Sequence, residues 1–88
     1  MSPDENKKYS KQIIGKTVVS KTGKRFGEVG DISFETRTGE LLQIVLRSPT
    51  SYTQDLELER NKAGELIIPF SAVIAVGDFV VVAEEDII

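Results

Sequence analysis

Short runs rich in β-branched residues and leucine, separated by turn signals, limit the fold of this chain most strongly. Glycine-bearing or proline-bearing turn sequences recur about every ten residues between these runs. This spacing is typical of an all-β sandwich or barrel. A flat sheet of this size would expose its edges and one apolar face, which promotes aggregation. We therefore predict an all-β fold, a small and partly open β-barrel of five to six short antiparallel strands with one short helical turn.

Six extended segments are expected, over residues 17–20, 25–35, 40–47, 55–59, 66–68 and 79–83. In the second, the apolar positions change parity around Gly27 and Gly30, which indicates a bulge. In the third, Leu42, Ile44 and Leu46 are expected on one face. The sequence DLELE at 55–59 alternates like a strand, with a short helical turn as the alternative. Residues 70–74 predict a single helical turn, and the dipeptide at 77–78 predicts a hairpin before the last strand.

The chain is expected to form one domain over residues 11–88, preceded by a flexible polar tail over residues 1–10. No apolar run approaches the roughly 18–20 residues that cross a bilayer as a helix. The first eleven residues are polar and charged and do not resemble a secretory signal. These features predict a cytoplasmic protein that would reach a membrane only indirectly, through a partner.

The composition removes most familiar catalytic chemistry. The chain has no cysteine and no histidine, which excludes Ser-His-Asp and Cys-His sites and zinc sites built on those ligands. Asp31 could be a metal or proton-transfer carboxylate, but an aspartate beside glycine in a strand more often bonds nearby turn amides. The three acids of the DLELE run could bind a hard cation, but acids at this spacing more often form the solvent-exposed face of a strand. We therefore expect no catalytic, cofactor-binding or metal-binding residue, no cofactor and no small-molecule substrate.

Charge is distributed unevenly along the chain. Residues 1–47 carry nine Lys or Arg and six Asp or Glu, whereas residues 48–88 carry two and eight. Between residues 7 and 27 every charge is positive, so Lys16, Lys21, Lys24 and Arg25 form a candidate anion-facing patch. The alternative is a solvated face that the acidic half balances in space. A pI of about 4.9 disfavours nucleic acid as a partner.

The last segment holds more apolar side chains than a small barrel needs. If Phe79 and Val81 help to fill the barrel, Val80 and Val82 would face outward and form an apolar strip that suits a partner. Barrel filling alone is the alternative. Ile87 and Ile88 could extend a strand onto another subunit, or simply fray. Pairing of the last strand in two copies would give a two-fold interface. The candidate partner or dimer interface comprises Phe79, Val80, Val82, Ile87 and Ile88.

Two motifs resemble the PRC-barrel family. The opening stretch IIGKTVVS at 13–20, followed by Gly23, Gly27, Val29 and Asp31, resembles that family's Gly-Lys-x-Val strand, turn glycine and Gly-x-Val-x-Asp strand. The closing stretch IPFSAVIAVGDFVVV at 68–82 resembles its last segment, in which Ile-Pro-Phe-x-x-Val leads into a hairpin. The structural motif residues are Gly15, Gly23, Gly27, Asp31 and Pro69.

The resemblance implies a small barrel that is not an enzyme and that acts as an adaptor in protein–protein interaction. The amino-acid sequence of the last segment is most similar to that of short standalone archaeal members of the family, among them the cell-division proteins called CdpB. Such members imply a homodimer, or a heterodimer with a PRC-barrel paralogue, and possible recruitment through SepF to the division site at the inner face of the membrane. The alternative is an RNA-binding accessory factor in ribosome maturation, similar to RimM.

Overall fold

The computed structural model describes residues 12–87 of the chain and shows an all-β fold. The expected tail at 1–10 lies outside these residues. The elements with bounds within residues 12–87 are, in chain order, β1 (Thr17–Ser20), β2 (Arg25–Phe34), β3 (Leu41–Arg47), α2 (Ser51–Gln54), β4 (Ile67–Pro69), η1 (Phe70–Ala72), β5 (Val73–Val76), β6 (Phe79–Val82) and η2 (Glu84–Asp86).

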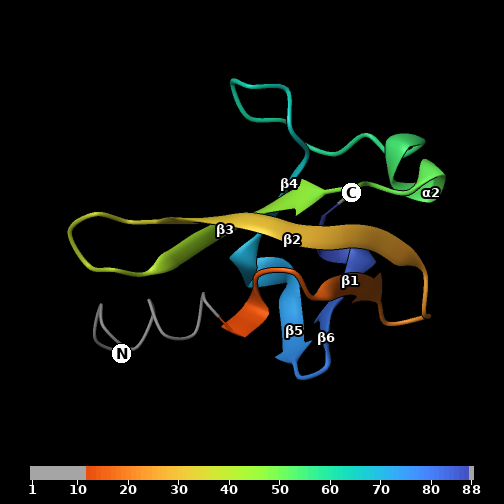
Figure 1. Ribbon diagram of the computed structural model, residues 1–88, viewed down its shortest axis with the longest axis horizontal. Helices are drawn as coiled ribbons and strands as arrows, with labels where there is room; N and C mark the ends of the chain where they lie inside the picture. Colours follow the sequence, from red (N-terminus) through yellow and green to blue (C-terminus); the bar gives the residue numbers. More distant parts are fainter. Residues whose placement is uncertain (1–11, 88) are drawn as a thin grey trace.

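The six strands form one sheet in the order β4-β3-β2-β1-β6-β5 (Figure 1). All neighbouring pairs are antiparallel except β1 and β6, which run parallel, so the expectation of a purely antiparallel barrel is wrong at that pair. A parallel pair needs a long crossover, and here the rest of the domain lies between the two strands in the sequence.

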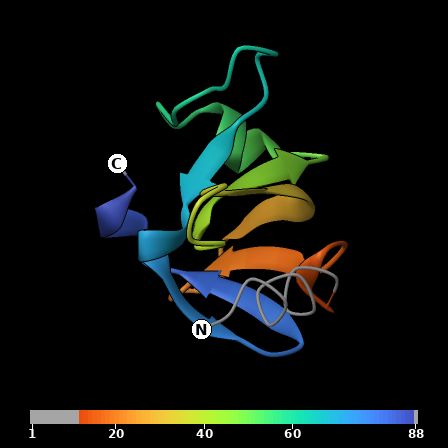
Figure 2. The same ribbon diagram turned by 90° about the vertical axis from the view of Figure 1, so that its left-hand side faces the viewer.

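The sheet curls but does not close, because its end strands β4 and β5 are not paired with each other. In Figure 2 the strands lie one below the other, and the η1 turn joins the two end strands on one side of the curl. The η1 turn also contacts β3. The prediction of a partly open barrel is confirmed in this form.

Irregular register bends β2 where the glycines lie. The register between β1 and β2 shifts at Val18/Val19, and that between β2 and β3 shifts at Val29/Asp31, as the parity change predicted. A Cβ at Gly30 would lie 2.8 Å from the Arg47 Cβ. Glycine therefore allows β2 and β3 to approach where an alanine would clash.

A buried apolar cluster fills the concave side of the sheet. It draws on every strand except β5 and includes the fully buried Phe26, Ile44 and Ile68. Val73 and Val76 of β5 pack against it. Thr53 of α2 is also fully buried, and its hydroxyl donates to the Phe26 carbonyl. This bond satisfies the polar group that the short helix carries into the core.

Two details of the expected strands differ from the structure. Residues 55–59 form neither a strand nor the helical turn. The short helix α2 lies just upstream instead, at 51–54. The Thr50 side chain caps this helix by accepting a hydrogen bond from the Thr53 amide. Leu42 does not share the face of Ile44 and Leu46. A register shift against β2 leaves Leu42 without a partner position and 44% exposed.

Candidate interaction surface

The two faces of β6 are reversed relative to the prediction from sequence. Val80 and Val82 are fully buried, so the prediction that they face outward is wrong. Their register explains the burial, because Val80 is paired with Val18, which is itself fully buried. Paired residues in adjacent strands point to the same side of a sheet. Phe79 therefore belongs to the opposite, outer face, and it is 53% exposed.

The outer face of β1, β6 and β5 carries an apolar surface, which we call the outer patch. Register places Phe79 beside Thr17, and Val81 between Val19 and Ala75. Phe79 and Ala75 are exposed, and Val81 is partly exposed. Neighbouring strands lie about 4.8 Å apart, so side chains in register touch along this face. The outer patch comprises Val19, Ile74, Ala75, Phe79 and Val81.

Ile74 gives this surface its second large exposed side chain. The register between β5 and β6 shifts between Val73 and Ala75, so Ile74 is the extra residue of a bulge. Its side chain is 52% exposed, whereas Val73 packs against the core. Ile74 and Phe79 therefore expose apolar area on the same face, and a contiguous exposed apolar surface marks an interaction site more often than single exposed residues do.

The strand that ends the sheet is β5, not β6. Because β6 lies between β1 and β5, it has no free edge, and the expected pairing of two last strands between copies is wrong. Within the described residues, β5 pairs only with β6. The edge available to a partner strand is therefore that of β5. The helical turn predicted over residues 70–74 is confirmed only over Phe70–Ala72, because Val73 and Ile74 belong to β5.

Ile87 does not extend a strand. Ile87 follows η2, donates its amide to the Glu84 carbonyl and packs against the core cluster. Ile88 lies outside the described residues. An interface role for both stays a prediction.

The four candidate anion-facing residues do not form one patch. Lys16 precedes β1 and Lys21 follows it, and a strand of four residues separates its ends by about 13 Å. The Lys16 ammonium donates to the Gly77 carbonyl in the β5–β6 turn, and the Lys24 ammonium lies 5.8 Å from the centre of the Tyr52 ring. Arg25, at the start of β2, is exposed. Anion binding stays a prediction.

One basic residue already has an acidic partner. The Lys21 ammonium lies 2.5 Å from a Glu85 carboxylate oxygen, and both side chains are exposed. This hydrogen bond raises the pKa of Lys21 and lowers the pKa of Glu85. The nearby Tyr52 hydroxyl donates to the Glu84 carboxylate, which raises the pKa of Tyr52. Residues of the acidic half thus balance part of the basic half, as the alternative interpretation expected.

The motif residues occupy structural positions. The Gly15 amide donates a hydrogen bond to the Val29 carbonyl, and Gly23 lies in the β1–β2 turn. Gly27 has a φ of 149°, and a Cβ there would lie 3.0 Å from the Arg47 carbonyl oxygen. Asp31 is exposed and accepts from the amide of the next residue. Pro69 ends β4 and precedes η1.

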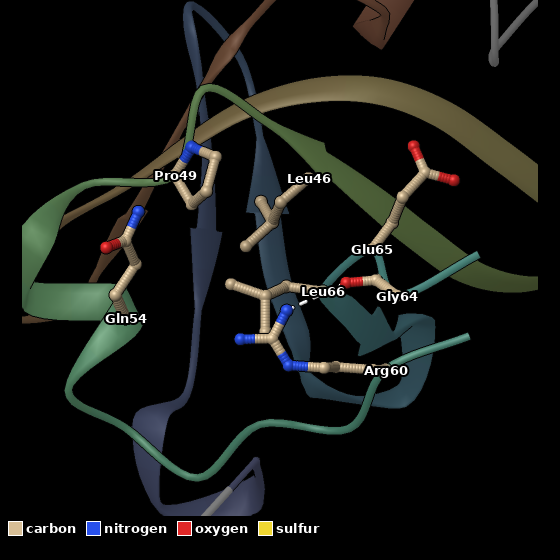
Figure 3. Close-up of a pocket in the computed structure, with 7 residues that line it drawn as sticks. All are labelled: Leu46, Pro49, Gln54, Arg60, Gly64, Glu65 and Leu66. Atoms are coloured by element: carbon tan, nitrogen blue, oxygen red, sulfur yellow. Dashed lines mark hydrogen bonds between the residues drawn. The ribbon is translucent and has the colours of Figure 1, made fainter. Parts of the chain in front are cut away.

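A hollow of about 390 Å³ lies between α2 and the loop that leads into β4 (Figure 3). Leu46, Pro49 and Leu66 provide its apolar wall, and the Arg60 side chain crosses it to donate to the Gly64 carbonyl at 2.7 Å. Gln54 and Glu65 also line the hollow. Residues 12–87 contain no group of three acids placed to hold a metal ion, the acids at 55–59 included, and no helix among them is long and apolar enough to cross a membrane.

The family model for the PRC-barrel domain matches residues 5–86 of the chain. The chain belongs to the PRC-barrel domain family. This family consists of small non-catalytic domains that often mediate protein–protein interaction. A search of the curated proteins found no match to the chain. The family agrees with the curled, open sheet of short strands.

Proposed function

We propose that this PRC-barrel protein is a protein-interaction module that forms a dimer and docks a protein partner through the outer patch. The observation that carries the proposal is the pair of half-exposed side chains on the β5–β6 hairpin, Phe79 and Ile74. Large aromatic side chains contribute strongly to interfaces because they bury much area at little cost in conformational entropy. A small domain that leaves two large apolar groups in water is stabilised when a partner covers them.

The composition of the outer patch supports a protein partner over a charged ligand. Its members are uncharged, and polar or charged residues border it at Thr17, Lys16 and Asp78. An apolar centre with a polar rim is the usual anatomy of a protein interface. Phosphate recognition depends instead on clustered cationic side chains, and the predicted basic residues lie at both ends of β1.

We further propose that the protein acts in archaeal cell division as a CdpB-like member of the family, alone or with a PRC-barrel paralogue. The amino-acid sequence at 68–82 resembles that of short archaeal members of the family, and this resemblance supports the subtype. In this role the domain would link to SepF and thereby be recruited to the division site. It would need no catalytic group and no membrane segment of its own.

Sedimentation from micromolar to millimolar concentration tests the dimer, for the chain alone and mixed with a purified PRC-barrel paralogue. We expect a concentration-dependent dimer that weakens when Phe79 is replaced by Ser. The matched control is Thr36→Ser, which changes an exposed residue in the β2–β3 turn. A monomer throughout, with no binding to the paralogue, would contradict the proposal. Direct binding to purified SepF tests the cell-division role separately, since a dimer that ignores SepF would remove only that part.

A further inference from the structure

We infer that two copies of the chain pair through the outer edges of their β5 strands, antiparallel and about a two-fold axis, so that one continuous sheet crosses the dimer. The inference rests on the proposed function, because it specifies how the dimer is made. It commits to a second copy as the occupant of the β5 edge. Three features of the described residues support it: the open edge, its lack of charge, and the closure of the opposite edge.

The first feature is the open edge itself. Strand β5 ends the sheet and pairs only with β6 among residues 12–87. An edge strand presents unpaired backbone N–H and C=O groups that another strand can use. Natural edges are commonly protected by lysine, proline or a bulge. Here β5 has no lysine and no proline, and a bulge at Ile74 is the one such device that the strand contains.

The second feature is the absence of charge along this edge. Residues 69–77 contain no Asp, Glu, Lys or Arg. Antiparallel pairing about an axis between Ile74 and Ala75 would bring each of these residues opposite the other in the second copy. The same register pairs Val73 with Val76, so no residue of β5 brings a charge opposite another charge. Like charges opposite each other destabilise strand pairs, and self-pairing here creates none.

The third feature is that the opposite edge of the sheet is closed. The Ile67 amide of β4 donates to the Glu59 carbonyl at 2.9 Å, and Arg60 forms a bridge with Leu66. Pro69, the last residue of β4, has no N–H to donate. Pairing of β5 with β4 of the next copy would build an open filament. With one open edge only, pairing ends at two copies.

Pairing at the edge also extends the apolar surface. A stable interface buries about 800 Å² on each partner, which is a substantial share of the 5590 Å² that the monomer exposes. Four residues of strand edge supply only part of this area. At the axis, Ile74 of each copy lies opposite Ala75 of the other, and the outer patches of the two copies become neighbours. A protein partner would then face a surface twice as large.

Amide hydrogen exchange followed by NMR on the full chain tests the inference. We expect amides of β5 that exchange rapidly in the dilute monomer to slow at least tenfold when the dimer forms. We also expect an isotope-mixed sample to show contacts between Ile74 of one copy and Ala75 of the other. Ala75→Lys should raise the dimer Kd at least tenfold, about 1.4 kcal/mol. Thr36→Lys adds the same charge at an exposed turn position and should leave the Kd unchanged.

The possible outcomes separate the two proposals. A dimer whose β5 amides gain no protection overturns edge pairing and leaves the proposed interaction module standing. Protection that is already complete in the dilute monomer shows that another segment of the same chain covers the edge, which also overturns the inference. A chain that stays monomeric overturns edge pairing between two copies, and it contradicts the interaction module as well when the paralogue also fails to bind. Assemblies larger than two copies would contradict the closed β4 edge.

Discussion

Separate truncation of Val80 and Phe79 tests whether the two faces of β6 have different roles. Val80 is fully buried and Phe79 is 53% exposed, although the two residues are adjacent. Val80→Ala removes two methyl groups from the core, a transfer term of about 1.6 kcal/mol. The unfilled space adds about 1 kcal/mol. The expected loss of unfolding free energy is therefore about 2–3 kcal/mol, a large share of the stability of so small a domain.

Phe79→Ala should behave in the opposite way. About half of its side chain stays in water, so truncation should cost the monomer only about 1 kcal/mol. The same change removes the largest exposed apolar group of the outer patch, and we expect the dimer Kd to rise at least tenfold, about 1.4 kcal/mol. Val80→Ala, when folded, should leave the Kd close to that of the wild type.

Urea unfolding of dilute protein measures the first effect, and sedimentation equilibrium measures the second. With an m-value near 1 kcal/mol/M for a small domain, Val80→Ala should lower the midpoint by about 2–3 M. An unchanged m-value would show that both variants unfold from the same compact state. If Phe79→Ala lowered the midpoint more than Val80→Ala, the assignment of the two faces would be wrong.

Three further changes test other parts of the structure. Gly27→Ala should lower the free energy of unfolding by about 2 kcal/mol, because the φ of Gly27 is 149° and a Cβ would press on backbone of the neighbouring strand. Thermal unfolding measures this loss, with Gly77→Ala as the control because Gly77 has open space around it. The pKa of Glu85 is lowered by Lys21, so the folded state gains stability above the unfolded pKa and loses it as pH falls through the folded pKa; NMR titration of Glu85 should show its pKa rising in Lys21→Ala. Thr53→Val should cost about 1 kcal/mol by removing a buried hydrogen bond, and a neutral result in urea unfolding would show that the bond adds nothing net.

The sequence supported the architecture well because turns carry local signals. The glycines at 23, 39 and 64 all lie in turns with positive φ, where the pattern placed the ends of strands. The bulges in β2 were also predictable, since a change in parity is visible in the order of apolar residues. The parallel pairing of β1 with β6 was not, because it depends on contacts between residues about 60 positions apart.

The face of a strand was the hardest feature to predict, and the reason is the run Phe79-Val80-Val81-Val82. All four residues are apolar, so alternation gives no phase, and volume alone favoured the phenylalanine as a core residue. The phase is set by Val18, whose burial fixes that of Val80 through register. A bulge at Ile74 likewise separates its side chain from the core. The candidate surface therefore depends on long-range pairing, whereas the fold class depends on local turns.

The open curl of the sheet also explains why the candidate interaction surface lies at one end of the sheet. Curling brings the apolar faces of the strands together, and η1 joins the end strands without pairing them. The gap leaves two edges, of which the loop before β4 covers one. The other edge borders the only strand of the described sheet that contributes no fully buried side chain to the core. A strand that packs weakly on its own subunit and presents an uncharged edge gains most from a second subunit, which is the physical basis for placing the dimer contact at β5.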